Sequence, residues 1–290
     1  MSTRPEGTPR AVEPAPMPHL ADHLDHMRLR GLSVRYIETR RLTVRRIARH
    51  LGCDPLDATT AQMKAWQRSR RVGIGAMYNE VSHLQEYSSW AVEQQLLDHD
   101  PMRVLVTPKL PRRLPRPAPD DLLLQAIADA PPDIRLMLVL AGWQGLRACE
   151  LAALDRADIL DRDIPPVILL HGKGSRDRIV PLGSLVLAEI RRYDPAPWGP
   201  VFPRGDGEPG HIRAQRVSQR VSHYLTTRGL PFTLHGCRHR FATQVYRSTL
   251  DLRMVQELLG HSSPTTTAIY AGFAVEKSAA ALDALSLTLG

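Results

Sequence analysis

The chain has 290 residues, of which 43% are hydrophobic and 23% charged, and its formal net charge is +8. This length suits one large domain or two ordinary ones, with enough apolar residues for a hydrophobic core. No apolar run is long enough to cross a membrane, and the N-terminus lacks the apolar segment of a secretory signal. We therefore expect a cytoplasmic protein that is not associated with a membrane. Three cysteines without a CxxC pair, Cys53, Cys149 and Cys237, argue against a disulfide framework or a zinc site.

The positive charge is concentrated in the first part of the chain. Residues 1–118 carry 19 Lys and Arg against 12 Asp and Glu, a net charge of +7, whereas residues 119–290 carry 19 against 18, a net charge of +1. A polyanion bound to the first part explains this asymmetry, but so does an ordinary basic surface. Only four of the 38 basic residues are Lys. Because the pKa of Lys can be tuned and that of Arg cannot, those four are candidates for positions that need an ammonium group.

The N-terminal part predicts a disordered start followed by an all-α domain. Residues 1–18 are rich in Pro and polar residues. From 19 to 100 the apolar spacing is helical, and in RRLTVRRIARHLG the residues Val44, Ile47 and Leu51 recur on one face. Gly52 is the expected C-cap of that helix. Two further helices are predicted, near residues 61–69 and 76–97. The arginines of the first helix give it a basic side, which a solvated helix in a small bundle would also have.

A basic, proline-rich stretch divides the chain. Residues 101–119 predict an extended linker, because prolines at this density prevent a helix. Residues 120–290 then predict a second domain that is mainly helical with a small antiparallel sheet, an α+β fold. VILLH at 167–171 and RIVPL at 178–182 read as a β-hairpin with Lys173 at its tip. Helices are predicted near 123–127, 132–143, 184–193, 212–228, 234–249, 252–259, 264–273 and 275–289.

Two stretches of the second domain place polar residues where they need partners. In LHGCRHRFAT, His235 and Arg238 share a face of a largely buried helix, with His239 close to it. In GLRACEL, Arg147 follows the most apolar helix of the chain, where a cation is costly unless it meets an anion. That anion is either the nearby Glu150 or a bound phosphate. The histidines and Arg238 suit a phosphate site, although polar residues on a wet surface would show the same pattern.

The stretch LGHSSPTTTAIY near the C-terminus joins two predicted helices. Gly260 fits a helix C-cap, and Ser263 with Pro264 fits the start of the next helix. His261 is then expected in a tight turn, and Tyr270 about two turns into the second helix. Taken alone, the pattern favours a half-buried packing role for Tyr270 over a reactive one.

Together these motifs resemble those of the tyrosine recombinases of the phage integrase family. GLRACEL resembles the first arginine motif, HGKGSRDRIVPL the β-hairpin lysine motif, LHGCRHRFAT the HxxRH motif and LGHSSPTTTAIY the motif that ends in the nucleophilic tyrosine. All four occur in the family's order over residues 145–270. The helical, basic residues 19–99 are similar in kind to the family's core-binding domain.

The resemblance implies DNA cleavage and rejoining without a metal or cofactor. Tyr270 would attack the scissile phosphate to give a 3′-phosphotyrosine, and Arg147 and Arg238 would clamp the phosphate oxygens. The implied remaining catalytic residues are Lys173 as acid for the leaving 5′-oxygen, His235 in proton transfer and His261 as a hydrogen-bond donor to the phosphate, with His239 in support.

The resemblance also implies a two-domain clamp around double-stranded DNA. The expected DNA-contacting residues are Arg40, Arg41, Arg45, Arg49, Arg68, Arg70, Arg71, Arg112 and Arg113. The C-terminal helix, 275–289, is expected to dock on a neighbouring protomer in a synaptic tetramer, although packing on its own domain is the alternative. An accessory DNA-bending or directionality protein is a possible further partner.

Integration of a mobile element is the leading function. The alternatives are Xer-like resolution of chromosome or plasmid dimers, a monomeric nicking–closing enzyme of the type IB topoisomerase kind, and a DNA-binding regulator with a vestigial site. The target sequence and the direction of recombination are not readable from the chain, because specificity depends on a few base contacts and on DNA shape.

Overall fold

The computed structural model of the chain describes residues 17–111, 114–171 and 177–260. The chain divides into an N-terminal unit, Met1–Arg112, and a C-terminal unit, Arg113–Gly290. Each unit has hydrophobic clusters of its own. Among the described residues, no helix is both long and apolar enough to span a lipid bilayer.

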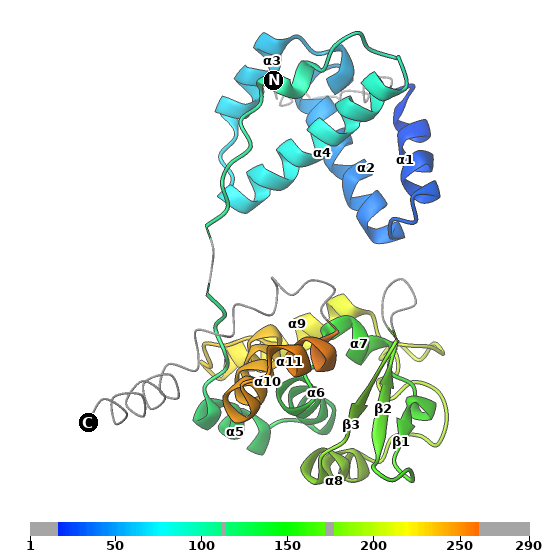
Figure 1. The fold of residues 1–290 in the computed structure, drawn as a ribbon, viewed down its shortest axis with the longest axis vertical. Helices are drawn as coiled ribbons and strands as arrows, with labels where there is room; N and C mark the ends of the chain where they lie inside the picture. The colour runs from blue at the N-terminus through cyan, green and yellow to red at the C-terminus, as the bar shows by residue number, and fades with distance from the viewer. Residues whose placement is uncertain (1–16, 112–113, 172–176, 261–290) are drawn as a thin grey trace, which may run out of the picture. The chain divides into compact units, whose positions relative to one another are not determined.

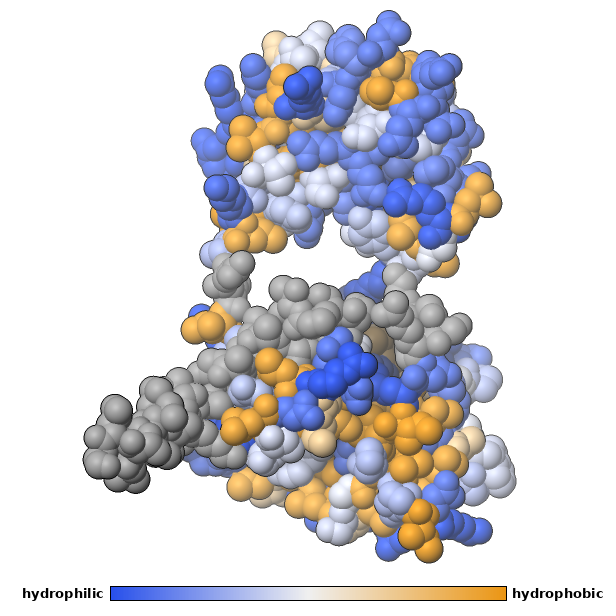
Figure 2. Space-filling view, in the orientation of Figure 1, coloured by the Kyte–Doolittle hydropathy of each residue, from blue (hydrophilic) through white to orange (hydrophobic). Residues whose placement is uncertain are grey.

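The N-terminal unit is helical throughout its described part, which confirms the prediction of an all-α domain (Figure 1). Its elements are α1 (Leu20–Leu29), α2 (Val34–Leu51), η1 (Pro55–Asp57), α3 (Thr60–Ser69), α4 (Ile74–Glu93) and η2 (Pro101–Val104). α2 packs against α1 and α4, and α3 packs against η2. The face of this unit seen in Figure 2 is mainly hydrophilic, with apolar residues scattered over it.

Capping residues explain the limits of these helices. Ser33 accepts a hydrogen bond from the backbone N–H of Tyr36 at the start of α2, and Gly52 ends that helix with φ 77°. Only a left-handed residue closes a helix in this way, so the predicted C-cap is confirmed. Thr59 and Gln62 form a capping box at the start of α3.

The stretch 101–119 is less extended than the sequence predicts. η2 packs against α3 and α4, and Met102 is fully buried in the N-terminal unit. At the other end, Ala118 belongs to the core of the C-terminal unit and donates its backbone N–H to the carbonyl of Gly236, at 2.9 Å. Both ends of the stretch are therefore parts of folded units.

The C-terminal unit is mainly helical with a small antiparallel sheet, as predicted. Its elements are α5 (Asp120–Ala128), α6 (Pro132–Trp143), α7 (Ala148–Ala153), η3 (Arg156–Asp158), β1 (Ile159–Leu160), β2 (Val167–Leu170), β3 (Arg178–Pro181), α8 (Ser184–Tyr193), α9 (Ala214–Thr227), α10 (Leu234–Thr249) and α11 (Leu252–Leu259). The strand order is β1-β2-β3, with Ile168 opposite Val180. The predicted hairpin is confirmed, and the short β1 extends it. The hairpin tip with Lys173 and the helices predicted at 264–273 and 275–289 lie outside the described residues.

Helix α6 is the centre of this unit. Its residues from Leu136 to Gly142 are all buried, which fits its continuously apolar sequence. α6 packs against α10, α8, α5 and α9, and α11 lies against both α10 and β3 (Figure 1). This packing brings the start of α7, the N-terminal half of α10, the start of β3 and the end of α11 into one region.

Candidate active site

Helix α10 positions three of the polar side chains that the sequence singles out. Thr233 caps the helix by accepting a hydrogen bond from the backbone N–H of Gly236. Two residues further on, Arg238 points into the protein, with only 2% of its surface exposed. His239 is half-buried and His235 is exposed, and their rings contact at 4.3 Å between centroids. The predicted cluster on the first half of this helix therefore forms.

Arg147 is placed by the tight turn that joins α6 to α7. Gly145 adopts φ 68°, and a Cβ there would lie 2.5 Å from the Phe241 ring, so the turn requires glycine. Arg147 is the N-cap of α7 and donates its backbone N–H to Glu150 at 2.7 Å. Its guanidinium donates to the same carboxylate at 2.8 Å. The sequence offered Glu150 or a phosphate as the partner of Arg147, and the structure shows that Glu150 contacts it.

Glu150 is a buried carboxylate shared by three arginines. Besides Arg147, it accepts two hydrogen bonds from Arg178, at 2.8 and 3.0 Å, and lies 3.7 Å from the guanidinium of Arg238. Burial alone would raise the pKa of Glu150, but the hydrogen bonds and charge of Arg178, aided by Arg147 and Arg238, lower it to about 2. The carboxylate is therefore ionised at all physiological pH values. Three guanidiniums around one carboxylate leave this region positively charged, which suits a phosphate.

The last backbone carbonyls of α11 complete the arrangement. Arg178 donates to the carbonyl of Leu258 at 2.9 Å, Arg238 to that of Leu259 at 2.7 Å and Arg147 to that of Gly260 at 3.4 Å. Arg238 also donates to the carbonyl of Gly145. The C-terminal end of a helix has unsatisfied carbonyls and a partial negative charge, so it is a natural acceptor for guanidinium groups. The arginines and the end of α11 are thus held together.

Both histidines have a lowered pKa, which favours their neutral form. His235 is exposed overall, but desolvation of its ring and then the charges of Arg238 and Arg147 lower its pKa. Burial, followed by the neighbouring His235 and Arg238, lowers the pKa of His239 to about 4. A neutral imidazole can accept a proton, which is the role that the resemblance implies for His235.

Of the predicted catalytic residues, the structure brings Arg147, Arg238 and His235 together. Lys173, His261 and Tyr270 lie outside the described residues. Sequence reasoning missed Arg178, whose contact with Leu258 joins residues 80 positions apart. Its place in the lysine motif, HGKGSRDRIVPL, was the available signal. Within the described ranges, no group of three or more His, Cys, Asp or Glu is arranged to hold a metal ion.

The predicted DNA-contacting arginines fall into four classes, of which the fully buried Arg40 is described separately below. Arg45, Arg49, Arg68 and Arg71 are exposed, as a DNA contact requires. Arg41 and Arg70 are half-buried and engaged, by Glu38 and Glu80 respectively. Arg112 and Arg113 lie outside the described residues.

Arg40 contradicts its prediction. Its side chain is fully buried and donates to Glu86 and to the hydroxyl of Tyr36. The physical reason is helical periodicity, because Arg40 precedes Val44 by four residues and Ile47 by seven and so shares their apolar face. It cannot contact DNA from this position.

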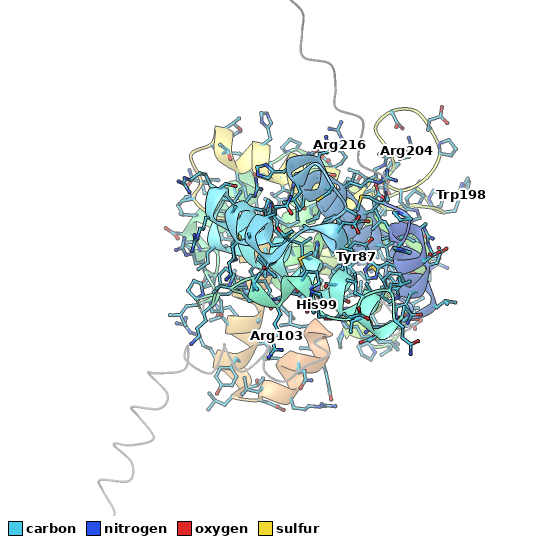
Figure 3. All side chains as sticks on the ribbon, turned by 90° about the horizontal axis from the view of Figure 1, so that it is seen from above. Tyr87, His99, Arg103, Trp198, Arg204 and Arg216 are labelled. Carbon is cyan, nitrogen blue, oxygen red and sulfur yellow. The ribbon has the colours of Figure 1, made fainter. Side chains whose placement is uncertain are left out.

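A row of arginines on α9 was also missed. Arg213, Arg216 and Arg220 recur at helical spacing and, with Arg204, line an open hollow (Arg204 and Arg216 are labelled in Figure 3). Arg220 pairs with Asp133 and Arg204 with Asp206. A count of charges missed this basic surface, because residues 119–290 carry a net charge of only +1.

The similarity to known proteins agrees with this geometry. Residues 121–277 match the model of the phage integrase family. The tyrosine recombinase XerC of Xylella fastidiosa (strain M23) is 36% identical over 224 residues, which cover 72% of this chain and 75% of that protein. Two lambda integrase structures share the fold: a dimer bound to a COC′ core site (TM-score 0.71, 21% identity, 87% of this chain and 93% of that chain) and a tetramer bound to a Holliday junction (TM-score 0.70, 20% identity, 87% and 76%).

The matched region contains both motif arginines, Glu150 and the end of α11, and the family model extends past Tyr270. The order of the four motifs, the convergence of the two arginines and the match of more than half of the chain all lead to one assignment. The chain belongs to the phage integrase family and is a tyrosine-type site-specific recombinase, a DNA strand transferase.

Proposed function

We propose that Tyr270 is the nucleophile and that the reaction proceeds through a 3′-phosphotyrosine. The phenolic oxygen of Tyr270 forms a bond to the scissile phosphorus while the bond from phosphorus to the 5′-oxygen breaks. The tyrosine proton passes to His235, and Lys173 donates a proton to the leaving 5′-oxygen, which departs as a 5′-hydroxyl. Rejoining is the reverse attack by a 5′-hydroxyl, so the energy of the phosphodiester bond is retained.

Arg147 and Arg238 are proposed to hold the non-bridging oxygens of the phosphate. The supporting observation is that both guanidiniums meet at Glu150, at the end of the helix that leads toward Tyr270. Arg147 is the more available of the two, because about a third of its side chain is exposed and its contact to Gly260 is long, at 3.4 Å. The guanidinium of Arg238 is held by hydrogen bonds to the carbonyls of Gly145 and Leu259. Fixed donors around developing negative charge are the main source of rate enhancement in such sites. His261 is proposed to add a hydrogen bond to the phosphate, with His239 supporting His235.

Both units are proposed to contact the DNA duplex as a clamp. In the N-terminal unit the exposed Arg45, Arg49, Arg68 and Arg71 support this, and in the C-terminal unit the α9 row supports it. Contacts of this kind position the backbone and make affinity fall with salt. The protein is proposed to act on chromosomal or plasmid DNA in the bacterial cytoplasm, as a synaptic tetramer, with or without an accessory DNA-bending or directionality protein.

The biological role is proposed to be integration of a mobile element. Xer-like dimer resolution remains a second candidate, because the relative described above is a XerC recombinase. Both roles use the same strand chemistry. A plasmid carrying two directly repeated core sites, compared with a pair of plasmids carrying one site each, separates them: resolution acts on the first and integration on the second.

The chemistry is tested by a covalent adduct assay. Purified protein is incubated in EDTA with labelled DNA that flanks its own gene, and SDS-resistant adducts are resolved by electrophoresis. The wild-type protein should form an adduct at one phosphate, and Tyr270→Phe should form none while binding the DNA normally. Tyr246→Phe, which removes a hydroxyl from α10, is the matched control and should behave as wild type. An adduct that persists in Tyr270→Phe would assign the nucleophile elsewhere.

A further inference from the structure

Arg178 is tied to two separate parts of the region around Glu150. It is the first residue of β3, and its side chain is 10% exposed. Its two terminal nitrogens donate to the two oxygens of Glu150, at 2.8 and 3.0 Å, and its Nε donates to the carbonyl of Leu258 at 2.9 Å. Three donors thus meet three acceptors from two elements that are distant in sequence.

The glycine at the end of α11, Gly260, leaves space for the side chain of Arg178. Gly260 ends α11 with φ 62°, and a Cβ at this position would lie 3.0 Å from Nη1 and 3.1 Å from Cδ of Arg178. Most real Cβ contacts are longer than this, so a side chain here would crowd the guanidinium and glycine serves two purposes. It closes the helix in a left-handed conformation, and it leaves room for the guanidinium above the helix end.

The contacts require the shape of arginine as well as its charge. A planar guanidinium presents its donors as a rigid fork, which matches a carboxylate and a neighbouring carbonyl at the same time. A lysine has a single nitrogen on a flexible stem. It could neutralise Glu150, but it could not also hold the Leu258 carbonyl and both carboxylate oxygens in one geometry.

We propose that Arg178 is a positioning residue for strand cleavage, which acts through Glu150 on Arg147 and Arg238 and through the Leu258 carbonyl on the end of α11. Arg178 itself does not touch the phosphate. It joins strand β3, the carboxylate that orients both phosphate-binding arginines, and the helix end from which the chain continues for ten residues to Tyr270. This inference rests on the proposed role of Tyr270 and the two arginines.

The test uses the full-length protein with three substitutions. Arg178→Met removes the fork and keeps the apolar stem, Arg178→Lys keeps the charge alone, and Arg191→Met removes one exposed positive charge from α8 as the matched control. For each we measure the single-turnover rate of adduct formation, the Kd for core-site DNA and the Tm. Both Arg178 variants should lose about 100-fold in rate, since a displacement of about 1 Å in a catalytic group has that effect. Their Kd should stay within about threefold, and the control should match wild type.

The pH dependence of the adduct rate distinguishes a positioning role of Arg178 from a role in stabilising the fold alone. The charged groups that face Glu150 are Arg147, Arg178 and Arg238, and Arg178 has the largest lowering effect on its pKa. Removing Arg178 raises that pKa, so Glu150 gains a proton at a higher pH. The adduct rate of Arg178→Met should therefore decline on the acid side at a higher pH than that of the wild type. If Arg178→Met does not fold, the rate of Arg178→Lys decides alone.

Three outcomes would overturn the proposal. The first is full activity in Arg178→Met, and the second is wild-type activity in Arg178→Lys. The third is weaker DNA binding together with a lower Tm, to an extent that accounts for the lower rate. The first two would show that the fork is not needed, and the third that Arg178 only stabilises the fold. A failure of the proposed chemistry would look different, because the wild-type protein would then form no adduct that depends on Tyr270.

Discussion

Two arginines with little exposed side chain, Arg40 and Arg178, each donate hydrogen bonds to a glutamate. Arg40 was grouped with surface arginines on charge alone, yet its spacing from Val44 already placed it on the apolar face. The structure gives it Glu86 and Tyr36 as partners, which is the usual condition for burying a charge. Arg178 was missed although it lies in the lysine motif, because its partners belong to α7 and α11, which are distant from it in sequence.

The surroundings of Arg40 lead to a prediction on acid stability. His23 and His83 are buried, and burial followed by the charge of Arg40 lowers the pKa of each to about 4. The charge of Glu86 opposes this effect. An unfolded histidine binds its proton near pH 6.5, so stability is complete above that pH and is lost as pH falls toward 4. Each histidine should contribute roughly 3 kcal/mol to that loss.

Urea unfolding of the full-length protein, followed by tryptophan fluorescence at pH 7.5 and pH 5, measures this loss. Relative to wild type, His23→Gln should lose less stability between the two pH values. His99→Gln, at an exposed position, is the matched control and should leave the pH dependence unchanged. Equal pH dependence in wild type and His23→Gln would contradict the assignment.

At the scale of elements, the turn between α6 and α7 makes the sharpest prediction. Gly145→Ala should destabilise the fold by about 1–3 kcal/mol, because the added Cβ both strains a left-handed residue and meets the Phe241 ring at 2.5 Å. It should also slow adduct formation, since the Gly145 carbonyl holds Arg238.

Gly229→Ala is a matched control for the backbone alone. Gly229 has nearly the same φ, 67°, but no atom lies within 4 Å of a Cβ built there. Gly229→Ala should lower the free energy of unfolding by about 1 kcal/mol and leave the cleavage rate unchanged. Equal effects of the two substitutions on rate would mean that the packing at Gly145 does not position Arg238.

The elements themselves were largely predictable where local signals are strong. The limits of α8, α10 and α11 agree with the predicted ranges, because apolar periodicity and caps such as Gly260 mark them. β1 was missed because it has two residues, too few for an alternating pattern. The helix predicted at 76–97 is α4, and it ends at Glu93. The chain turns just after it, at Gln95, which has φ 59°. No glycine or proline announces that turn.

The motif residues of the site could be named from the sequence, but their arrangement could not. Spacing on one helix relates His235 to Arg238. That spacing does not predict that Arg147 and Arg238 share the Glu150 carboxylate. Nor does it predict that three arginines donate to successive carbonyls at the end of α11. Those contacts depend on how α7, α10, β3 and α11 pack around α6, which is a property of the tertiary fold.

For the whole molecule, the prediction concerns assembly. Residues 275–289, outside the described part of the chain, are expected to dock on a neighbouring protomer. Deleting residues 276–290 should then abolish pairing of two DNA sites and recombination, while a single protomer still binds one core site. Gel mobility with one-site and two-site DNA, together with a recombination assay, measures both. Recombination at the wild-type level after the deletion would rule out this role.

The use of main-chain acceptors at the end of α11 has a practical consequence for engineering. A carbonyl is the same in every amino acid, so the contacts made by Arg147, Arg178 and Arg238 do not depend on the outward side chains of that helix. Met254 is exposed, and Arg253 and Glu257 pair with each other in solvent. A mutant library that randomises these three positions should retain cutting activity in most members, which makes this helix face a suitable place to install labels, tethers or new partner contacts.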